Sequence, residues 1–209
     1  MLNFDLNRII LILPGILLAL TVHEFSHGYV AYLIGDPTAK NNGRLTLNPI
    51  AHIDPLGFLM LMFAGFGWAK PVPVNPYYFT IDRRKGTLLV SLAGPASNIV
   101  MAILLTLLFG LVIRFTGGLG YVTQQLFISA ISINLVLAVF NLFPIPPLDG
   151  SKILISLFPT RFEQTFYEME RYTYIILILL LVLGVIRRVL FPIVNVLFSL
   201  LMGLLTLIV

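Results

Sequence analysis

Long uncharged apolar runs constrain this chain more than any other feature of its sequence. Five of them lie at residues 9–22, 86–113, 115–148, 172–186 and 189–209. A helix needs about 20 apolar residues to cross the hydrocarbon core of a bilayer, and backbone groups inside lipid must find their hydrogen bonds within the protein. These runs predict an all-α polytopic membrane protein with about five transmembrane helices.

The overall composition supports the same class of protein. Of the 209 residues, 58% are hydrophobic and 11% are charged, whereas soluble domains carry about 25% charged residues. The net charge of +4 comes from basic residues scattered through the connections between apolar runs. We therefore expect the lipid bilayer as a partner and no nucleic acid. The absence of cysteine excludes disulfides and thiolate chemistry.

We expect one membrane-embedded domain over residues 1–209. Its first helix is predicted at 8–35, with the arginine near its start extending its side chain to the membrane surface. We do not expect this run to be cleaved as a signal peptide, because no small-residue cleavage site follows it. The other helices are predicted at about 86–114, 121–143, 166–186 and 189–209.

Residues 36–85 are the least regular part of the chain. Within them, LGFLMLMFAGFG at 56–67 is apolar but short for a crossing and contains three glycines, which favours a re-entrant or interfacial segment. The following FGWAKPVPVNPYYF at 66–79 alternates valine with proline. Proline removes backbone donors, so this stretch predicts an extended loop or an edge strand rather than a helix.

The segment TVHEFSHGYV at 21–30 places three ionisable groups inside an apolar helix. Residues four apart project from the same helix face, so His23 and His27 can bind one metal ion together. Glu24 lies beside the first histidine, where it can act as a general base on a water molecule, as in zinc hydrolases with an HExxH helix. The alternative is a chance match on a solvent-facing helix. The cost of ionisable groups at bilayer depth favours the metal site.

A catalytic zinc site usually has three protein ligands, so a third ligand is needed. The remaining acids and histidines are Asp5, Asp36, His52, Asp54, Asp82, Asp149, Glu163, Glu168 and Glu170. Asp149 is the strongest choice, because it follows a long uncharged run and lies in the proline-stiffened segment NLFPIPPLDG at 141–150. Its alternative role is that of a turn or N-cap residue before the amphipathic stretch GSKILISLF.

Topology provides a second reason for choosing Asp149. If residues 56–67 are re-entrant, the helix at 86–114 crosses the membrane away from the end of the first helix, and the helix at 121–143 crosses back. Asp149 then arrives at the end of the bundle where the first helix ends. That end carries nine basic residues against four at the other, which predicts a cytoplasmic location by the positive-inside rule. The nine are Lys40, Arg44, Lys70, Arg83, Arg84, Lys85, Lys152, Arg161 and Arg171, and the four are Arg8, Arg114, Arg187 and Arg188. The site is therefore expected to open toward the cytoplasm.

Three motifs in this order resemble the signatures of a known family. HEFSH, AGPASN at 93–98 and NLFPIPPLDG are similar to those of the site-2 protease family of intramembrane zinc metalloproteases, and FGWAKPVPVN resembles a further segment of its compact members. The resemblance is to forms without PDZ or CBS modules. It implies one Zn²⁺ per chain, with His23, His27 and Asp149 as ligands and Glu24 as the catalytic base.

Other polar residues have candidate roles in such a site. Asn98 and Asn141 are neutral amides that could stabilise developing negative charge or hold the substrate backbone, and the alternative for each is hydrogen bonding between helices. His52 and Asp54 could contact the metal or its ligands, and the alternative is an ordinary solvated loop. The valine–proline stretch could pair with an unwound substrate, or it could be a surface connection.

The expected function is that of an intramembrane zinc metalloendopeptidase. It would hydrolyse peptide bonds within or near transmembrane segments, in regulated proteolysis or in the clearance of membrane peptides. Its partners would be a transmembrane protein or peptide substrate, the bilayer and a separate regulatory protein. The alternative is a non-proteolytic metal-binding membrane protein or a transporter, although the sequence shows no internal repeat of the kind that transporters carry.

Overall fold

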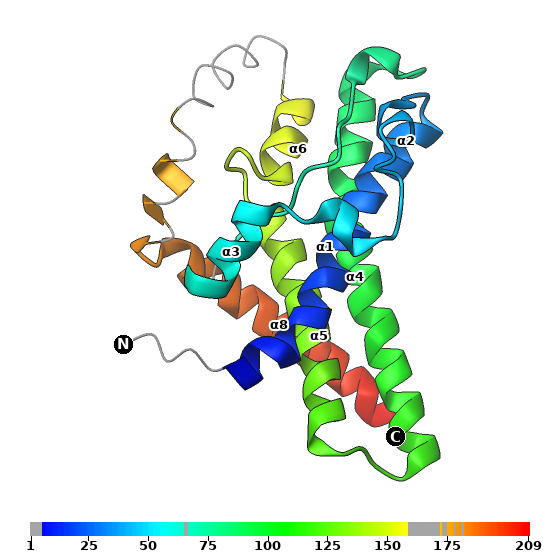
Figure 1. Cartoon of the computed structure of the whole chain (residues 1–209), viewed down its shortest axis with the longest axis vertical. Helices are drawn as coiled ribbons and strands as arrows, with labels where there is room; N and C mark the ends of the chain where they lie inside the picture. The colour runs from blue at the N-terminus through cyan, green and yellow to red at the C-terminus, as the bar shows by residue number, and fades with distance from the viewer. Residues whose placement is uncertain (1–5, 65–66, 159–171, 173–174, 178, 181) are drawn as a thin grey trace.

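The computed structural model describes residues 6–64, 67–158, 172, 175–177, 179–180 and 182–209, and these residues form an all-α protein (Figure 1). The prediction of an all-α chain is confirmed. The long helices are α1 (Leu6–Leu33), α4 (Arg83–Thr116), α5 (Tyr121–Asn141) and α8 (Val185–Ile208). Shorter elements are α2 (Thr38–Asn41), η1 (Pro49–His52), α3 (Pro55–Ala64), η2 (Pro76–Tyr78) and α6 (Asp149–Leu157).

Four helices among the described residues are long and apolar enough to cross a membrane. They are Ile10–Leu33 within α1, together with α4, α5 and α8. The chain is therefore a multi-pass membrane protein. The further helix predicted at 166–186 lies largely outside the described residues, so the predicted total of about five is not tested by this structure.

The first three long helices pack against one another, and α8 packs against α4 and α5. The core shared by α4, α5 and α8 consists of Ala102, Phe109, Ile131, Leu135, Val139, Ile186, Leu190 and Val194. A Cβ atom on Gly15 would lie 2.9 Å from the Cα of Ala130, so this glycine allows α1 and α5 to approach closely. Close backbone approach through small residues is a main source of helix association in lipid, because lipid and apolar side chains are equally hydrophobic.

The direction of α8 differs from the sequence-based assignment. Arg114, near the end of α4, donates from Nη1 to the carbonyl oxygen of Ile208 at 2.7 Å. The ends of α4 and α8 therefore lie together, and the two helices run in the same direction (Figure 1). The assignment of Arg187 and Arg188 to the same end of the bundle as Arg114 is wrong.

The segment containing α3 forms a hairpin. Ile53 pairs with Ala69 through an antiparallel bridge, and the backbone N–H of Lys70 donates to the carbonyl of His52 at 2.9 Å. A Cβ atom on Gly57 would lie 2.2 Å from the carbonyl oxygen of Trp68, so the returning chain packs directly on the helix. The chain thus leaves and re-enters the rest of the protein at the same place.

The tight connection from α5 to α6 carries Asp149 back into the bundle. The proline-rich segment ends α5 at Asn141, and α6 begins at Asp149. A Cβ atom on Gly150 would lie 2.3 Å from the carbonyl oxygen of Leu142, so glycine is required for the first turn of α6 to pack on the end of α5. This helix also packs against α4, and Asp149 is buried.

Candidate metal centre

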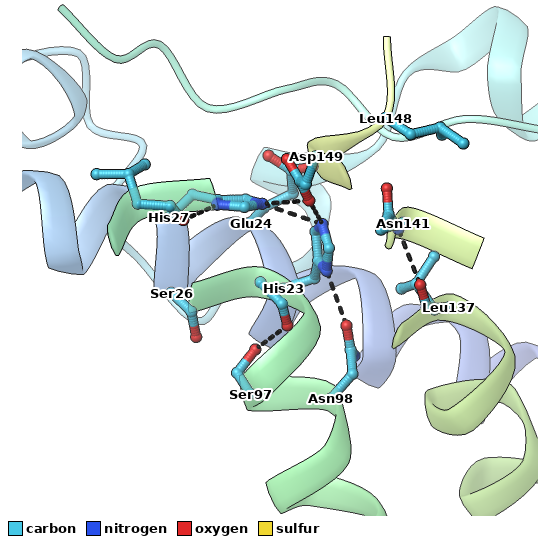
Figure 2. Close-up of polar contacts among 12 residues, drawn as sticks. His23, Glu24, Ser26, His27, Ser97, Asn98, Leu137, Asn141, Leu148 and Asp149 are labelled. Carbon is cyan, nitrogen blue, oxygen red and sulfur yellow. Dashed lines mark hydrogen bonds and ion pairs between the residues drawn. The ribbon is translucent and has the colours of Figure 1, made fainter. Parts of the chain in front are cut away.

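Three side chains from two segments that are far apart in the sequence meet inside the bundle (Figure 2). His23 and His27 come from α1 and Asp149 from the first turn of α6, and all three are buried. The two Nε2 atoms lie 3.0 Å apart. Each Nε2 atom also lies 3.2 Å from Oδ2 of Asp149. The three atoms therefore form a nearly equilateral triangle.

The dimensions of this triangle fit one zinc ion. Zinc binds histidine nitrogen and carboxylate oxygen at about 2.0–2.2 Å in a tetrahedral arrangement, which separates neighbouring ligand atoms by about 3.3 Å. The observed separations of 3.0 and 3.2 Å are close to that value. Three protein atoms would occupy three corners of the tetrahedron and leave the fourth for water or substrate.

The hydrogen bonds behind the two imidazoles determine which nitrogen of each carries hydrogen. Nδ1 of His23 lies 2.8 Å from Oδ1 of Asn98, and Nδ1 of His27 lies 2.7 Å from the carbonyl oxygen of Val90. Both partners are acceptors, so each Nδ1 must donate. In a neutral imidazole this leaves a lone pair on Nε2, and both lone pairs face the shared centre.

The carboxylate of Asp149 adds a third electron-rich atom to this centre. Within the described part of the chain, its Oδ2 atom is buried and accepts no hydrogen bond. Three lone-pair atoms without a hydrogen between them repel one another, and a bound cation converts that repulsion into attraction.

One face of α4 supports both histidines. Val90, Gly94 and Asn98 follow one another at intervals of four residues on α4. Because α4 is antiparallel to α1, Val90 contacts His27 and Asn98 contacts His23. A Cβ atom on Gly94 would lie 2.4 Å from Nε2 of His27 and 2.6 Å from Cε1 of His23. The glycine of the AGPASN motif therefore makes room for the imidazoles.

Glu24 lies beside the triangle (Figure 2). The valine–proline segment holds its carboxylate in place. Its Oε2 atom accepts a hydrogen bond of 2.7 Å from the backbone N–H of Val72. A Cβ atom on Gly28 would lie 3.0 Å from Cγ1 of Val72, so the absence of a side chain there lets the segment lie close to α1. The backbone N–H of Asn75 donates to Oδ2 of Asp36 at 2.6 Å, which fastens the segment at its far end.

The two asparagines singled out in the sequence lie in different places. Asn98 lies on the Nδ1 side of His23, away from the three ligand atoms. Asn141 is partly exposed, and its amide donates to the carbonyl of Leu137 in its own helix at 3.0 Å. A direct role for either amide in stabilising charge or binding substrate stays a prediction.

His52 and Asp54 do not belong to the group of metal-binding atoms found among the described residues. Nε2 of His52 donates to the carbonyl of Thr46 at 2.8 Å, which stabilises the loop before α3. Oδ1 of Asp54 accepts from the backbone N–H of Gly57 at 2.8 Å and caps α3. Both residues therefore stabilise the loop before α3 and the start of that helix.

Sequence reasoning missed Val90, Gly94 and Asn134. The role of Val90 lies in its backbone carbonyl, which every residue has, so no sequence signal marks it. Gly94 could have been found as the small residue four positions before Asn98. Asn134 is a polar residue two helical turns before Asn141 in an apolar run, and Oδ1 of Asn134 accepts from Nδ2 of Asn98 at 3.0 Å.

We predict that Gly94→Ala lowers zinc occupancy of the purified protein at least tenfold, because the added methyl group collides with both imidazoles. Metal content after dialysis against a weak chelator measures this loss. Gly203→Ala is the matched control, since a Cβ atom there meets nothing within 4 Å. Equal zinc content in the two variants would show that a methyl group at position 94 does not displace the imidazoles.

Comparisons with known proteins give the family. The profile of Peptidase family M50 matches residues 118–184. The candidate zinc metalloprotease YwhC of Bacillus subtilis is 42% identical over 184 residues, which cover 86% of this chain and 84% of YwhC. The candidate zinc metalloprotease Rip2 of Mycolicibacterium smegmatis is 30% identical over 194 residues, which cover 88% of this chain and 71% of Rip2.

A third relative matches most of the chain as well. The candidate zinc metalloprotease MJ0611 of Methanocaldococcus jannaschii is 31% identical over 154 residues, which cover 73% of each chain. No solved structure matches the chain significantly. The resemblance in the sequence motifs is thus confirmed, and the chain belongs to peptidase family M50, the site-2 protease family of zinc metalloproteases.

Proposed function

We propose that this protein is an intramembrane zinc endopeptidase that binds one Zn²⁺ through His23, His27 and Asp149. Its substrates would be transmembrane proteins or peptides, cut within or near their membrane segments. The observation that carries the proposal is the meeting of three lone-pair atoms at 3.0–3.2 Å, with their hydrogens directed away from the centre. Family membership supports the same conclusion.

Glu24 is the proposed base. Zinc, when bound, would lower the pKa of a water molecule to about 7 and polarise a peptide carbonyl. The carboxylate of Glu24 takes the proton of the attacking water and returns it to the departing amine. Its hydrogen bond from the Val72 N–H keeps Oε2 in place, so Oε1 remains for the proton transfer.

Replacing Glu24 separates hydrolysis from metal binding. Glu24→Gln removes the base but leaves the three proposed ligands, so we expect zinc to be retained while cleavage of a transmembrane peptide in liposomes falls at least a hundredfold. Unchanged cleavage would refute the assigned base. A native protein that binds zinc and cuts no peptide would instead favour the non-proteolytic alternative.

The valine–proline segment is the proposed binding site for the unwound substrate. In an extended chain, residues two apart direct their N–H groups to the same edge. The N–H of Val72 points to Glu24, so we propose that the N–H of Val74 faces the same edge of the segment. A substrate strand paired there would pass the catalytic base.

Two proline substitutions test this arrangement. Val72→Pro removes the donor to Glu24, so we expect kcat to fall. Val74→Pro leaves that donor in place and removes a backbone contact with substrate, so we expect KM to rise severalfold. Cleavage kinetics of both variants, with Val72→Ala and Val74→Ala as side-chain controls, measure the two effects. Kinetics of Val74→Pro equal to those of Val74→Ala would rule out pairing at this position.

The α3 hairpin is proposed to be re-entrant, and the metal centre to open toward the cytoplasm. The hairpin begins and ends at the pairing of Ile53 with Ala69, so it produces no net crossing. Seven described basic residues lie in α2, in the loops between α1 and α4, in the first turn of α4 and in α6, namely Lys40, Arg44, Lys70, Arg83, Arg84, Lys85 and Lys152. Positive charge of this kind marks the cytoplasmic side.

Single cysteines can test the orientation, because the native chain contains none. Asn42→Cys lies in an exposed turn near the proposed cytoplasmic end, and Tyr121→Cys lies at the exposed start of α5. We expect an impermeant thiol reagent added outside intact cells to label only the second variant. The opposite pattern would place the site on the outer side of the membrane.

A further inference from the structure

Three buried polar side chains from three helices are joined in line by hydrogen bonds, and the last of them, His23, belongs to the metal centre. Asn134 of α5 and Asn98 of α4 are completely buried, and His23 of α1 is 4% exposed. Nδ2 of Asn98 donates to Oδ1 of Asn134 at 3.0 Å, and Oδ1 of Asn98 accepts from Nδ1 of His23 at 2.8 Å. Polar side chains in a membrane bundle are costly unless they bond to one another.

The direction of every hydrogen bond in this line follows from backbone carbonyls at its ends. Nδ2 of Asn134 donates to the carbonyl of Ala130 at 2.8 Å, which turns its Oδ1 toward Asn98. Nδ2 of Asn98 also donates to the carbonyl of Ala19 at 2.9 Å. Both hydrogens of the Asn98 amide are therefore used, and a flipped amide would place its oxygen against two other acceptors.

The fixed amide of Asn98 presents an acceptor to His23, which keeps hydrogen on Nδ1 and the lone pair on Nε2. His27 obtains the same arrangement directly from the backbone carbonyl of Val90. The two imidazoles are thus held in different ways. The orientation of His23 depends on side chains from α4 and α5, whereas that of His27 depends on the backbone of α4.

We propose that Asn134 is a positioning residue for the metal centre, acting through Asn98 to fix the tautomer and orientation of His23. This inference rests on the proposed function, since it takes His23 as a zinc ligand. The competing explanation is that Asn134 only joins α4 to α5, as asparagines do in many membrane bundles. The two explanations differ in what happens to the metal, and a metal readout distinguishes them.

The test uses purified full-length protein in detergent. Asn134→Leu removes the acceptor for Asn98 and lets that amide turn, so zinc affinity measured by chelator competition should fall about 10- to 100-fold, as when other outer partners of metal ligands are removed. The visible spectrum of the Co²⁺-substituted protein should change as well, because it reports the coordination geometry. Asn134→Gln keeps both an amide oxygen and an amide N–H at this position, so it should lose less of the affinity and change the spectrum less than Asn134→Leu.

A matched control removes another buried polar group from α4. The hydroxyl of Thr106 is completely buried and bonds within its own helix, to the carbonyl of Ala102 at 2.8 Å. Thr106→Val should leave zinc affinity and the Co²⁺ spectrum unchanged. If Asn134→Leu does not fold, the smaller Asn134→Ala removes the same acceptor without adding bulk, and the same losses are expected.

Two results would overturn the proposal. One is a zinc affinity and Co²⁺ spectrum of Asn134→Leu, or of Asn134→Ala, equal to those of the native protein. The other is an equal loss in Asn134→Leu and Thr106→Val, which would reduce Asn134 to a structural contact. Failure of the native protein itself to bind zinc is a separate outcome, because it would refute the proposed function on which the inference rests.

Discussion

The packing of α1 against α4 is the contact on which the candidate site depends. A metal-binding histidine is oriented by an acceptor for its other ring N–H, and α4 provides both acceptors at matching intervals, with Gly94 between them. Asp149 then arrives from α6, which packs on the same helix. Residues distant in sequence thereby share one centre around α4.

Much of this arrangement could be predicted from the sequence, since the relevant physics is local. The interval of four between His23 and His27 places both on one helix face, and lipid makes their burial costly without a partner. Asp149 could be chosen because its proline-rich segment ends a helix at a definite position. A re-entrant or interfacial segment at 56–67 was expected from its length and glycines, and that assignment stays a prediction.

Other parts depend on contacts that a pattern of residue types does not show. The acceptor for His27 is a main-chain carbonyl, and Asn134 is assigned a role only once its neighbour across the helix interface is known. The placement of Arg187 and Arg188 at the same end as Arg114 was wrong for a similar reason, because the contact between Arg114 and Ile208 is a tertiary one.

The unequal support of the two histidines affects how this centre can change over generations. No codon change can delete the carbonyl that holds His27, because the peptide backbone is common to every amino acid. The group that holds His23 belongs to a side chain and is open to replacement. Heritable adjustment of metal binding in this lineage would therefore be concentrated on one imidazole, while the other stays constant.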